Sequence, residues 1–441
     1  MAFLFQSNFK TGRLRTLLVK GAVASFAIQV LFAGLAFLNA VILAHLLGAE
    51  GYGAFANAMA WVSLLVIPST FGFGALLVRD VAILRSRREW AALKGLLDFA
   101  KRFVVVLSLL LTLVFLVVVG FVFSSPEQEV MRLSLWVAAP LVPLFASLNV
   151  RESVARGLEH INRARLPGMV FRPGILLLGI GSINILWPGY ISAPVAMSVN
   201  VCAAIVSLVV AIFWLEKILP FEIDLVRPEY RSRVWLRAAF PMLVYGGMQV
   251  ILGQTDIVML GVMCSGEDVG LYAAASRLGY LLVYVTFAAD TILAPVVARL
   301  YASGEEERLQ RILLYSVRIS FLIVLPFGLL FIFFGENILV LFGHDFVAAK
   351  TALIVLAVGR LLDVALGSAA LVLAMTGNER IIAVSFMGVG LINIILNGVL
   401  IPRYGVEGAA FASILSLFAA KLFLGNYIRT KVGIRVTVLG I

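Results

Sequence analysis

The sequence predicts an all-α polytopic membrane protein with about 12 transmembrane helices, arranged as two six-helix lobes around a central cavity. Its 441 residues are 62% hydrophobic and only 13% charged, a balance that soluble globular proteins do not show. Uninterrupted apolar windows of about 20 residues, the length of a membrane-spanning helix, recur along the whole chain. Segments of the first half also recur in the second half. Because lipid offers no hydrogen-bond partner to the backbone, each window that crosses the bilayer is expected to be helical.

The first apolar window begins close to the N-terminus. A basic approach followed by apolar residues resembles a secretory signal, but the apolar stretch runs from Ala22 to about Leu47. The core of a signal peptide is only about 7–15 residues long, so we expect a retained first helix. Further windows complete a set of twelve predicted spans. They cover residues 22–47, 53–78, 103–123, 130–150, 166–186, 190–214, 238–262, 269–294, 312–334, 347–374, 381–401 and 407–428.

Arginine and lysine residues gather on alternate connections between the predicted spans. The opposite connections contain only Arg403. The positive-inside rule then predicts a multi-pass protein of the cytoplasmic (inner) membrane with both termini cytoplasmic. The formal net charge of +11 is expected to fix this topology and to contact anionic membrane lipids. We expect no nucleic-acid partner, because no nucleic-acid-binding module accompanies the charge.

An internal repeat divides the predicted spans into two sets of six. The stretch EGYGAFANA, Glu50–Ala58, returns 217 residues later as EDVGLYAAA, Glu267–Ala275. In the same order, GIGSINIL at Gly179–Leu186 returns as GVGLINII at Gly388–Ile395. Because six is even, the two sets enter the membrane from the same side and are parallel repeats.

A long polar stretch near the middle of the chain separates the two sets. It runs from Leu215 to Phe240 and is basic, so we expect a linker on the cytoplasmic surface. The predicted organisation is a six-helix lobe over residues 1–214, the linker over 215–237 and a second six-helix lobe over 238–441. Two lobes related in this way are expected to leave a central cleft between them.

Features that enzymes need are missing from the sequence. No connection is much longer than about 25 residues, which leaves no room for a soluble catalytic domain. The chain has no G-x-x-x-x-G-K-[ST] stretch for a triphosphate and no zinc-like spacing among its 3 histidines. Its 2 cysteines indicate no disulfide framework. We therefore predict a transporter and not an enzyme, with no cofactor and no metal site.

Ionisable residues inside the predicted spans are the candidate site residues, because such a group costs roughly 2.5–3.5 kcal/mol at the bilayer centre. Most of them lie in the second lobe. The candidates are Asp256 in the seventh span, Arg277 and Asp290 in the eighth, Arg360 and Asp363 in the tenth, and Arg172 in the fifth. Lys421 lies nearer a cytoplasmic end, where its side chain could reach the interface.

Two pairs among these candidates also have a purely structural interpretation, which stays open here. Arg360 and Asp363 are three residues apart on one helix and could neutralise each other. Asp256 could form an ion pair with Arg277 of the neighbouring helix. However, Arg277 lies roughly 12 Å inside the outer end of its span, at about 1.5 Å per residue. A cation at that depth favours ligand binding.

The first lobe contributes fewer polar groups. Arg172 directly precedes Pro173, and this pair predicts a locally broken helix. The uncharged Asn39 and Asn57 are expected to make hydrogen bonds between helices.

Three stretches, in this order, resemble one transporter family. They are LLGAEGYGAFANAMAWVSLLVIPSTFGFG, DIVMLGVMCSGEDVGLYAAASRL and MTGNERIIAVSFMGVGLINIILNGVLIPRYGVEGAAFASILS. Over essentially its whole length the chain resembles the polysaccharide-biosynthesis flippases of the multidrug/oligosaccharidyl-lipid/polysaccharide exporter (MOP) superfamily. The resemblance implies that the chain moves an undecaprenyl-pyrophosphate-linked oligosaccharide, such as an O-antigen or exopolysaccharide repeat unit, from the inner to the outer leaflet.

The resemblance also implies roles for two residues. In the family, the arginine of an A-x-R-L segment lines a cationic cavity, and this segment matches residues 275–278 with Arg277. The aspartate of the family's D-x-x-M-L-G segment matches Asp256. The planar guanidinium group of arginine suits a phosphate. Without an ATPase module, the energy comes from a coupling ion, H⁺ or Na⁺, or from consumption of the product outside, and polysaccharide-assembly proteins are further candidate partners.

Two other functions are kept as alternatives. A multidrug/cation antiporter of the same superfamily would have the same lobes and an acidic site in the first lobe, but the first span here contains no carboxylate. A membrane glycan polymerase or ligase is expected to have a large outer catalytic loop, which this sequence lacks. The repeat adds one asymmetry: 217 residues before Arg277 stands Ala60, so at this position of the repeat only the second lobe has a cation.

Overall fold

The computed structural model describes residues 11–125, 128–431, 433 and 437–438, and these residues form helices without any β-strand. The predicted all-α class is confirmed. The helices in chain order are α1 (Thr11–Thr70), α2 (Phe73–Ser86), α3 (Trp90–Val122), α4 (Glu129–Ala138), α5 (Leu141–Gly157), α6 (Ile161–Leu166), the π-helix η2 (Pro167–Phe171), α7 (Arg172–Leu186), α8 (Ala193–Glu216), the 3-10 helix η3 (Phe221–Ile223), α9 (Ser232–Met263), α10 (Gly266–Ala302), α11 (Glu306–Phe333), α12 (Gly335–Leu339), the 3-10 helix η4 (His344–Ala349), α13 (Lys350–Ala365), α14 (Ala369–Met375) and α15 (Glu379–Lys431). Residues 1–10 and 439–441, which form the two chain ends, lie outside the described residues.

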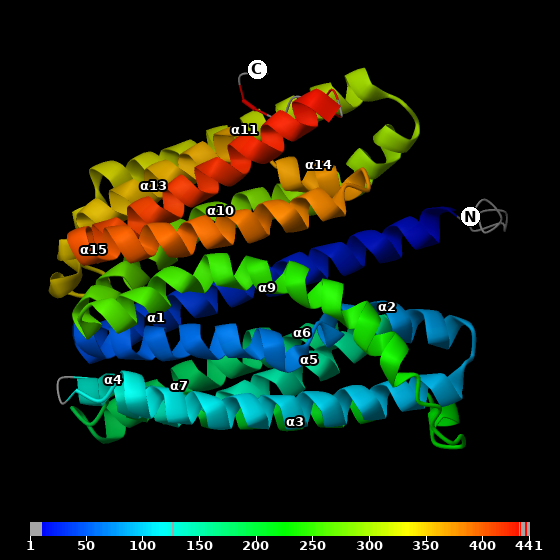
Figure 1. The fold of residues 1–441 in the computed structure, drawn as a ribbon, viewed down its shortest axis with the longest axis horizontal. Coiled ribbons are helices and arrows are strands. Elements are labelled where there is room, and N and C mark those ends of the chain that lie inside the picture. Colours follow the sequence, from blue (N-terminus) through cyan, green and yellow to red (C-terminus); the bar gives the residue numbers. More distant parts are fainter. Residues whose placement is uncertain (1–10, 126–127, 432, 434–436, 439–441) are drawn as a thin grey trace.

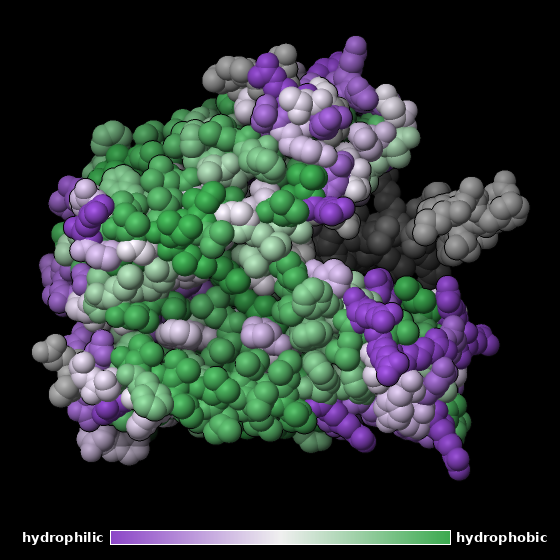
Figure 2. Space-filling model, viewed as in Figure 1, coloured by the Kyte–Doolittle hydropathy of each residue, from purple (hydrophilic) through white to green (hydrophobic). Residues whose placement is uncertain are grey.

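The long helices form a multi-pass membrane protein. Within the described residues, 9 helical segments are long and apolar enough to cross a bilayer, and the bent helix α9 raises the number to 10. Helices α1 and α15 each turn back on themselves (Figure 1), at Gly48 with φ 67° and at Gly405 with φ 53°. Residues that carry a Cβ atom rarely adopt such positive φ values, so glycine is the residue that permits these turns. Figure 2 shows a broad hydrophobic surface with hydrophilic residues towards both ends. The number of 12 spans stays a prediction, since it requires α1 and α15 each to count twice.

The two halves of the chain lie side by side in Figure 1, and their buried apolar clusters show where they meet. We call the end at which α1 and α15 turn back the turn end, and the opposite end, where α1 begins, the terminal end. One cluster, at the turn end, combines both halves, for example Ala44 and Tyr52 of α1 with Tyr272 of α10. At the terminal end, one cluster around Leu93 belongs to the first half with the start of α9, and another around Val372 belongs to the second half. The halves therefore share a core at the turn end and have separate cores at the terminal end.

A close backbone approach between the halves lies at the two copies of the internal repeat. A Cβ atom at Gly53 of α1 would overlap the Gly266 carbonyl oxygen and lie 2.7 Å from the Gly270 nitrogen of α10. Reciprocally, a Cβ at Gly270 would overlap the Ala49 carbonyl oxygen and lie 3.2 Å from the Gly53 nitrogen. Small residues four apart allow helix backbones to approach this closely. We call these four residues the gate contact.

Helix α9 packs on both halves. It bends by 52° between Ser232–Met248 and Val250–Met263. In the first part, Trp235 is buried in the cluster of the first half. In the second part, Asp256 is hydrogen-bonded to Asn397 of α15 in the second half. The division at residue 238 stays a prediction, because the start of α9 lies on the first half.

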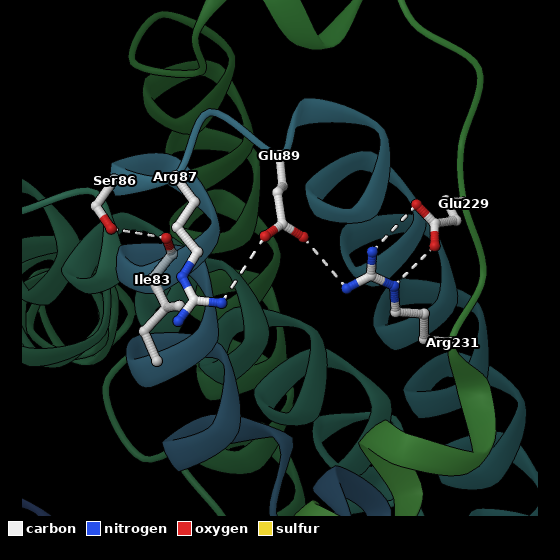
Figure 3. Close-up of polar contacts among 6 residues, drawn as sticks. All are labelled: Ile83, Ser86, Arg87, Glu89, Glu229 and Arg231. Carbon is white, nitrogen blue, oxygen red and sulfur yellow. Dashed lines mark hydrogen bonds and ion pairs between the residues drawn. The ribbon is translucent and has the colours of Figure 1, made fainter.

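The connection between α8 and α9 is fastened to the first half. The Glu229 backbone N–H donates to the Ala91 carbonyl oxygen of α3 at 2.9 Å. The Arg231 guanidinium lies 2.8 Å from the Glu229 carboxylate and 3.2 Å from the Glu89 carboxylate, and Arg87 lies 3.9 Å from the same Glu89 (Figure 3). The predicted linker is thus held by a chain of exposed ion pairs that ends on the turn between α2 and α3.

Candidate functional site

A cavity of about 270 Å³ lies between the two halves. Residues of α1, α7, α8, α9 and α10 line it. Its polar lining residues are Asn39, Tyr52, Ser63, Arg172, Asn200, Gln254, Ser276, Arg277 and Tyr280. No aspartate or glutamate occurs among the described lining residues, so the two arginines make the cavity cationic.

Arg277 reaches the cavity from the first third of α10. The start of this helix is fixed by Ser265, whose hydroxyl accepts from the Asp268 backbone N–H at 3.2 Å, while the Asp268 carboxylate accepts from the Ser265 backbone N–H at 3.2 Å. The Arg277 side chain is exposed, and Tyr52 of the first half is its neighbour in the cavity wall. No carboxylate of the described residues lies within ion-pair distance of it. Tyr52 is a hydrogen-bond neighbour, but no described carboxylate neutralises the Arg277 charge, which can therefore attract an anion.

Arg172 reaches the same cavity from the first half. It follows the π-helix η2, in which the Arg172 backbone N–H donates to the Pro167 carbonyl oxygen five residues earlier. The predicted irregularity next to Pro173 is confirmed, since Pro173 has no N–H to continue a regular helix. The Arg172 guanidinium lies 4.6 Å from the centre of the Phe145 ring. Asn39 of α1 secures this turn by donating to the Pro173 carbonyl oxygen at 2.9 Å, one of the predicted interhelical hydrogen bonds.

Asp256 is not part of the central cavity. Its buried carboxylate accepts hydrogen bonds from the Tyr272 hydroxyl at 2.6 Å, the Asn397 amide at 2.7 Å and the Asn393 amide at 3.2 Å, and a fourth from the Ser413 hydroxyl. Four neutral donors from α10 and α15 thus satisfy both oxygens. The ion pair with Arg277 that the sequence allowed does not form among the described residues.

Arg360 lies with Asp256 at a second, smaller cavity of about 30 Å³. Its guanidinium lies 5.1 Å from the centre of the Tyr280 ring, a cation–π contact. Tyr280 lines both this cavity and the central one, so its ring forms part of the wall between them. Arg360 does not pair with Asp363, although the two are three residues apart on α13.

Asp363 pairs instead with Lys421 of α15, at 2.8 Å. The prediction that Lys421 extends to the membrane interface is wrong, because its ammonium group is held inside the second half. Asp290 lines the same cavity as these two residues. The six predicted residues are therefore distributed over three cavities: Arg172 and Arg277, then Asp256 and Arg360, then Asp290 and Asp363.

Sequence reasoning missed several uncharged residues of the central cavity. Tyr52, Asn200 and Gln254 line it, and none of the three is charged. The signal that could have found Asn200 and Gln254 is an amide within a predicted span. Among the described residues there is no group of three or more His, Cys, Asp or Glu side chains suited to a metal ion.

Residues 18–301, more than half of the chain, match the model of the family described as polysaccharide biosynthesis protein. The chain belongs to this family. Residues 241–399 of this polysaccharide biosynthesis protein also match the MatE family model. The probable low-salt glycan biosynthesis flippase Agl15 of Haloferax volcanii is 24% identical over 431 residues, covering 95% of this chain and 85% of that protein.

Two solved structures share the fold of this polysaccharide biosynthesis protein. An inward-facing multidrug resistance MATE family transporter of the MOP superfamily gives a TM-score of 0.73 at 16% identity, covering 93% of this chain and 98% of the other. The lipid II flippase MurJ in an inward closed conformation gives 0.72 at 16% identity, covering 92% and 87%. These relatives are transporters and flippases, in agreement with the predicted transporter class.

Proposed function

We propose that this polysaccharide biosynthesis protein is a flippase that moves a polyprenyl-pyrophosphate-linked oligosaccharide across the cytoplasmic membrane by alternating access. The observation that carries the proposal is the central cavity, in which Arg172 and Arg277 meet no carboxylate among the described lining residues. Arginine binds phosphate oxygens through two parallel N–H donors. Two unpaired arginines on opposite halves suit the two phosphates of such a headgroup. The glycan flippase Agl15 supports the same class of cargo.

The separate cores at the terminal end and the shared core at the turn end support a cavity that is closed at the turn end. We assign the terminal end to the cytoplasm, because the connections rich in arginine and lysine lie there. The headgroup then enters from the cytoplasm while the polyprenyl tail remains in lipid. Release on the outer side requires the gate contact to separate. The two moving bodies are the predicted lobes, residues 1–214 and 238–441, except that the first part of α9, Ser232–Met248, moves with the first lobe.

The finer identity of the cargo belongs to the same proposal. We infer an O-antigen or exopolysaccharide repeat unit, passed to polysaccharide-assembly proteins at the outer surface. The chain has no G-x-x-x-x-G-K-[ST] stretch for a triphosphate, so we infer that a coupling ion, H⁺ or Na⁺, or consumption of the product outside drives net movement.

A multidrug/cation antiporter is the second candidate, supported by the MatE match and the shared fold. The charge of the central cavity argues against it. Two arginines without a nearby carboxylate repel a cationic drug, and Asn39, the polar residue of the first predicted span in this cavity, is neutral. A lipid pyrophosphate meets the opposite, favourable potential.

Deletion and complementation test the proposal. We expect the deletion strain to lose surface glycan and to accumulate lipid-linked oligosaccharide, measured by lipid extraction and mass spectrometry. Arg277→Ala should fail to complement although immunoblotting shows normal membrane insertion, and Arg277→Lys should complement in part because an ammonium lacks the bidentate geometry. Arg308→Ala is the matched control, since Arg308 forms an exposed pair with Glu305 at 3.0 Å and should complement fully. Drug sensitivity without accumulation of lipid-linked sugar would replace the proposal with the antiporter.

A further inference from the structure

The second half contains a third cavity, of about 200 Å³, that shares no lining residue with the central cavity. It is enclosed by α10, α11, the junction of α13 and α14, and α15. Its charged lining residues are Asp290, Asp363 and Lys421. The proposed flippase mechanism uses none of them.

One wall of this cavity is a broken helix. Helix α13 ends at Ala365 and α14 begins at Ala369. Gly367 between them has φ 75°, the left-handed conformation that ends helices. The break removes the N–H donors that the last carbonyl oxygens of α13 would meet in a continuous helix. Inside a membrane protein, these oxygens need other partners.

Two of the last four carbonyl oxygens of α13, those of Leu362 and Val364, still accept backbone N–H groups from Leu366 and Gly367. The Lys421 ammonium serves two other carbonyl oxygens at the break. It donates to the Gly367 carbonyl oxygen at 2.7 Å and to the Asp363 carbonyl oxygen at 3.3 Å, and it lies 2.8 Å from the Asp363 carboxylate. The Ala365 carbonyl oxygen is satisfied separately, by the Val438 backbone N–H at 2.8 Å. One carboxylate together with carbonyl oxygens at the C-terminal end of a broken helix is an oxygen set that membrane transporters use to coordinate a cation.

We propose that this helix break is a monovalent-cation site whose resident cation is the chain's own Lys421 ammonium. All three groups around the nitrogen are oxygen acceptors from a single segment, whereas the lysine comes from a different helix, α15. The pairing side chains are only 19% and 14% exposed, for Lys421 and Asp363 respectively, so solvent contributes little to balancing the charge. An ordinary surface ion pair has neither the backbone ligands nor this burial.

The other groups that face the site add a second negative charge, which a cation at the site neutralises. Asp290 of α10 is a second carboxylate near Lys421 and Asp363. Helix α11 contributes the hydroxyl residues Ser316 and Ser320, and no other titratable residue is among the described lining residues. Two carboxylates thus face one ammonium. If the ammonium is removed, the cavity retains buried negative charge that a small cation can neutralise.

The site bears on energy coupling, and this consequence rests on the proposed flippase function. A site occupied by a covalently attached cation does not need Na⁺ from solution. Na⁺ bound here is therefore not expected to drive transport. The existence of the site does not depend on what the central cavity carries.

Lys421→Ala tests the site directly. We expect the melting temperature of the purified variant to rise by a few degrees with increasing NaCl or methylammonium chloride, relative to choline chloride at equal ionic strength, because a ligand that binds only the folded state stabilises it. Wild type should show no such difference. Lys421→Met, whose side chain refills the space without charge, and Lys421→Ala/Asp363→Asn, which removes a ligand, should show none either.

Lys350→Ala is the matched control, because Lys350 pairs with Glu336 at 2.7 Å in the same half but at the exposed surface. It should respond equally to all three salts. If Lys421→Ala does not fold without added cation, recovery of folded protein in NaCl or methylammonium is the same readout, and Lys421→Ser provides a second variant. Equal stability or equal recovery in all salts would overturn the proposal. The Arg277→Ala test of the flippase is read from glycan export, so the two proposals fail independently.

Discussion

Gly53→Ala should weaken the gate contact and shift the protein away from the observed state. The new Cβ would overlap the Gly266 carbonyl oxygen and lie 2.7 Å from the Gly270 nitrogen, whereas non-bonded contacts prefer about 3.5–4.0 Å. Helices α1 and α10 would have to part by considerably more than about 1 Å to relieve the overlap with the Gly266 carbonyl oxygen, an overpacking that costs roughly 1–3 kcal/mol. The cost falls only on the state in which the gate contact exists. The equilibrium between closed and open gate should therefore shift by about 5–150-fold.

A pair of engineered cysteines reports the gate directly. A Cβ at residue 266 would lie 3.2 Å from the Glu50 Cγ and 3.9 Å from the Glu50 Cα, which suits the Cβ–Cβ separation of about 3.5–4.5 Å in a disulfide. We therefore expect Glu50→Cys/Gly266→Cys to cross-link rapidly under mild oxidation, measured by loss of maleimide labelling. The natural Cys264 and Cys202 should first be replaced by serine, because Cys264 lies two residues from the new pair and Cys202 is exposed to the label. Adding Gly53→Ala should slow cross-linking.

Two further variants decide whether the gate explains that result. Gly34→Ala is the matched control on the same helix, since a Cβ there meets nothing within 4 Å, and it should leave the cross-linking rate unchanged. Gly270→Ala should act like Gly53→Ala, because its Cβ would overlap the Ala49 carbonyl oxygen. If neither Gly53→Ala nor Gly270→Ala slows the reaction, the gate contact is not what holds the halves together.

Two other predictions concern stability. Tyr272→Phe removes the 2.6 Å hydrogen bond to the buried Asp256 carboxylate and should lower the free energy of unfolding by about 1.5–3 kcal/mol, measured by thermal unfolding. Tyr301→Phe is the control, because Tyr301 is 38% exposed, and it should leave the free energy of unfolding unchanged. Equal effects of the two variants would contradict the reasoning. In the linker, the hydrogen bond from Arg231 lowers the pKa of the Glu229 carboxyl. Because this pKa is lower in the folded protein than in the unfolded chain, the ionised carboxylate stabilises the folded linker at a pH above the ordinary pKa of glutamate. That stabilisation is lost as the pH falls through the lowered pKa. Amide hydrogen exchange in the linker should therefore become faster in acid for the wild type, and it should be fast at every pH for Arg231→Gln. Identical pH profiles for the two proteins would show that this ion pair does not hold the linker on the first half.

The fold and part of the site were predictable because they depend on local signals. A membrane-spanning helix must be apolar over its whole length, so hydropathy reveals it without knowledge of its neighbours. An unpaired cation at depth is conspicuous for the same reason, and Arg172 and Arg277 were identified in this way. Small residues in the repeat indicated close packing, but not that the two copies would pack on each other.

The partners of the charged residues were not predictable, because they come from distant helices. The local rule for residues three apart on a helix suggested that Arg360 neutralises Asp363. The structure gives Asp363 to Lys421, 58 residues further along the chain, and places Arg360 over Tyr280. Pairing across helices depends on how α13 and α15 pack against each other. The hydrophobic periodicity of either helix does not indicate which helix is its neighbour.

The asymmetry between the repeats follows from the geometry of the gate. Arg277 stands seven residues after Gly270, and Ala60 stands seven residues after Gly53, which is about two helical turns in each case. Both positions therefore lie on the gate-facing side of their helices, at equivalent depth. Ala60 is only 1% exposed, whereas Arg277 extends into the cavity. An arginine in both copies would bring two like charges together whenever the gate closed, and their repulsion would oppose closure. One arginine facing one alanine allows the halves to meet at the gate, while Arg277 remains available, together with Arg172, to an anionic cargo.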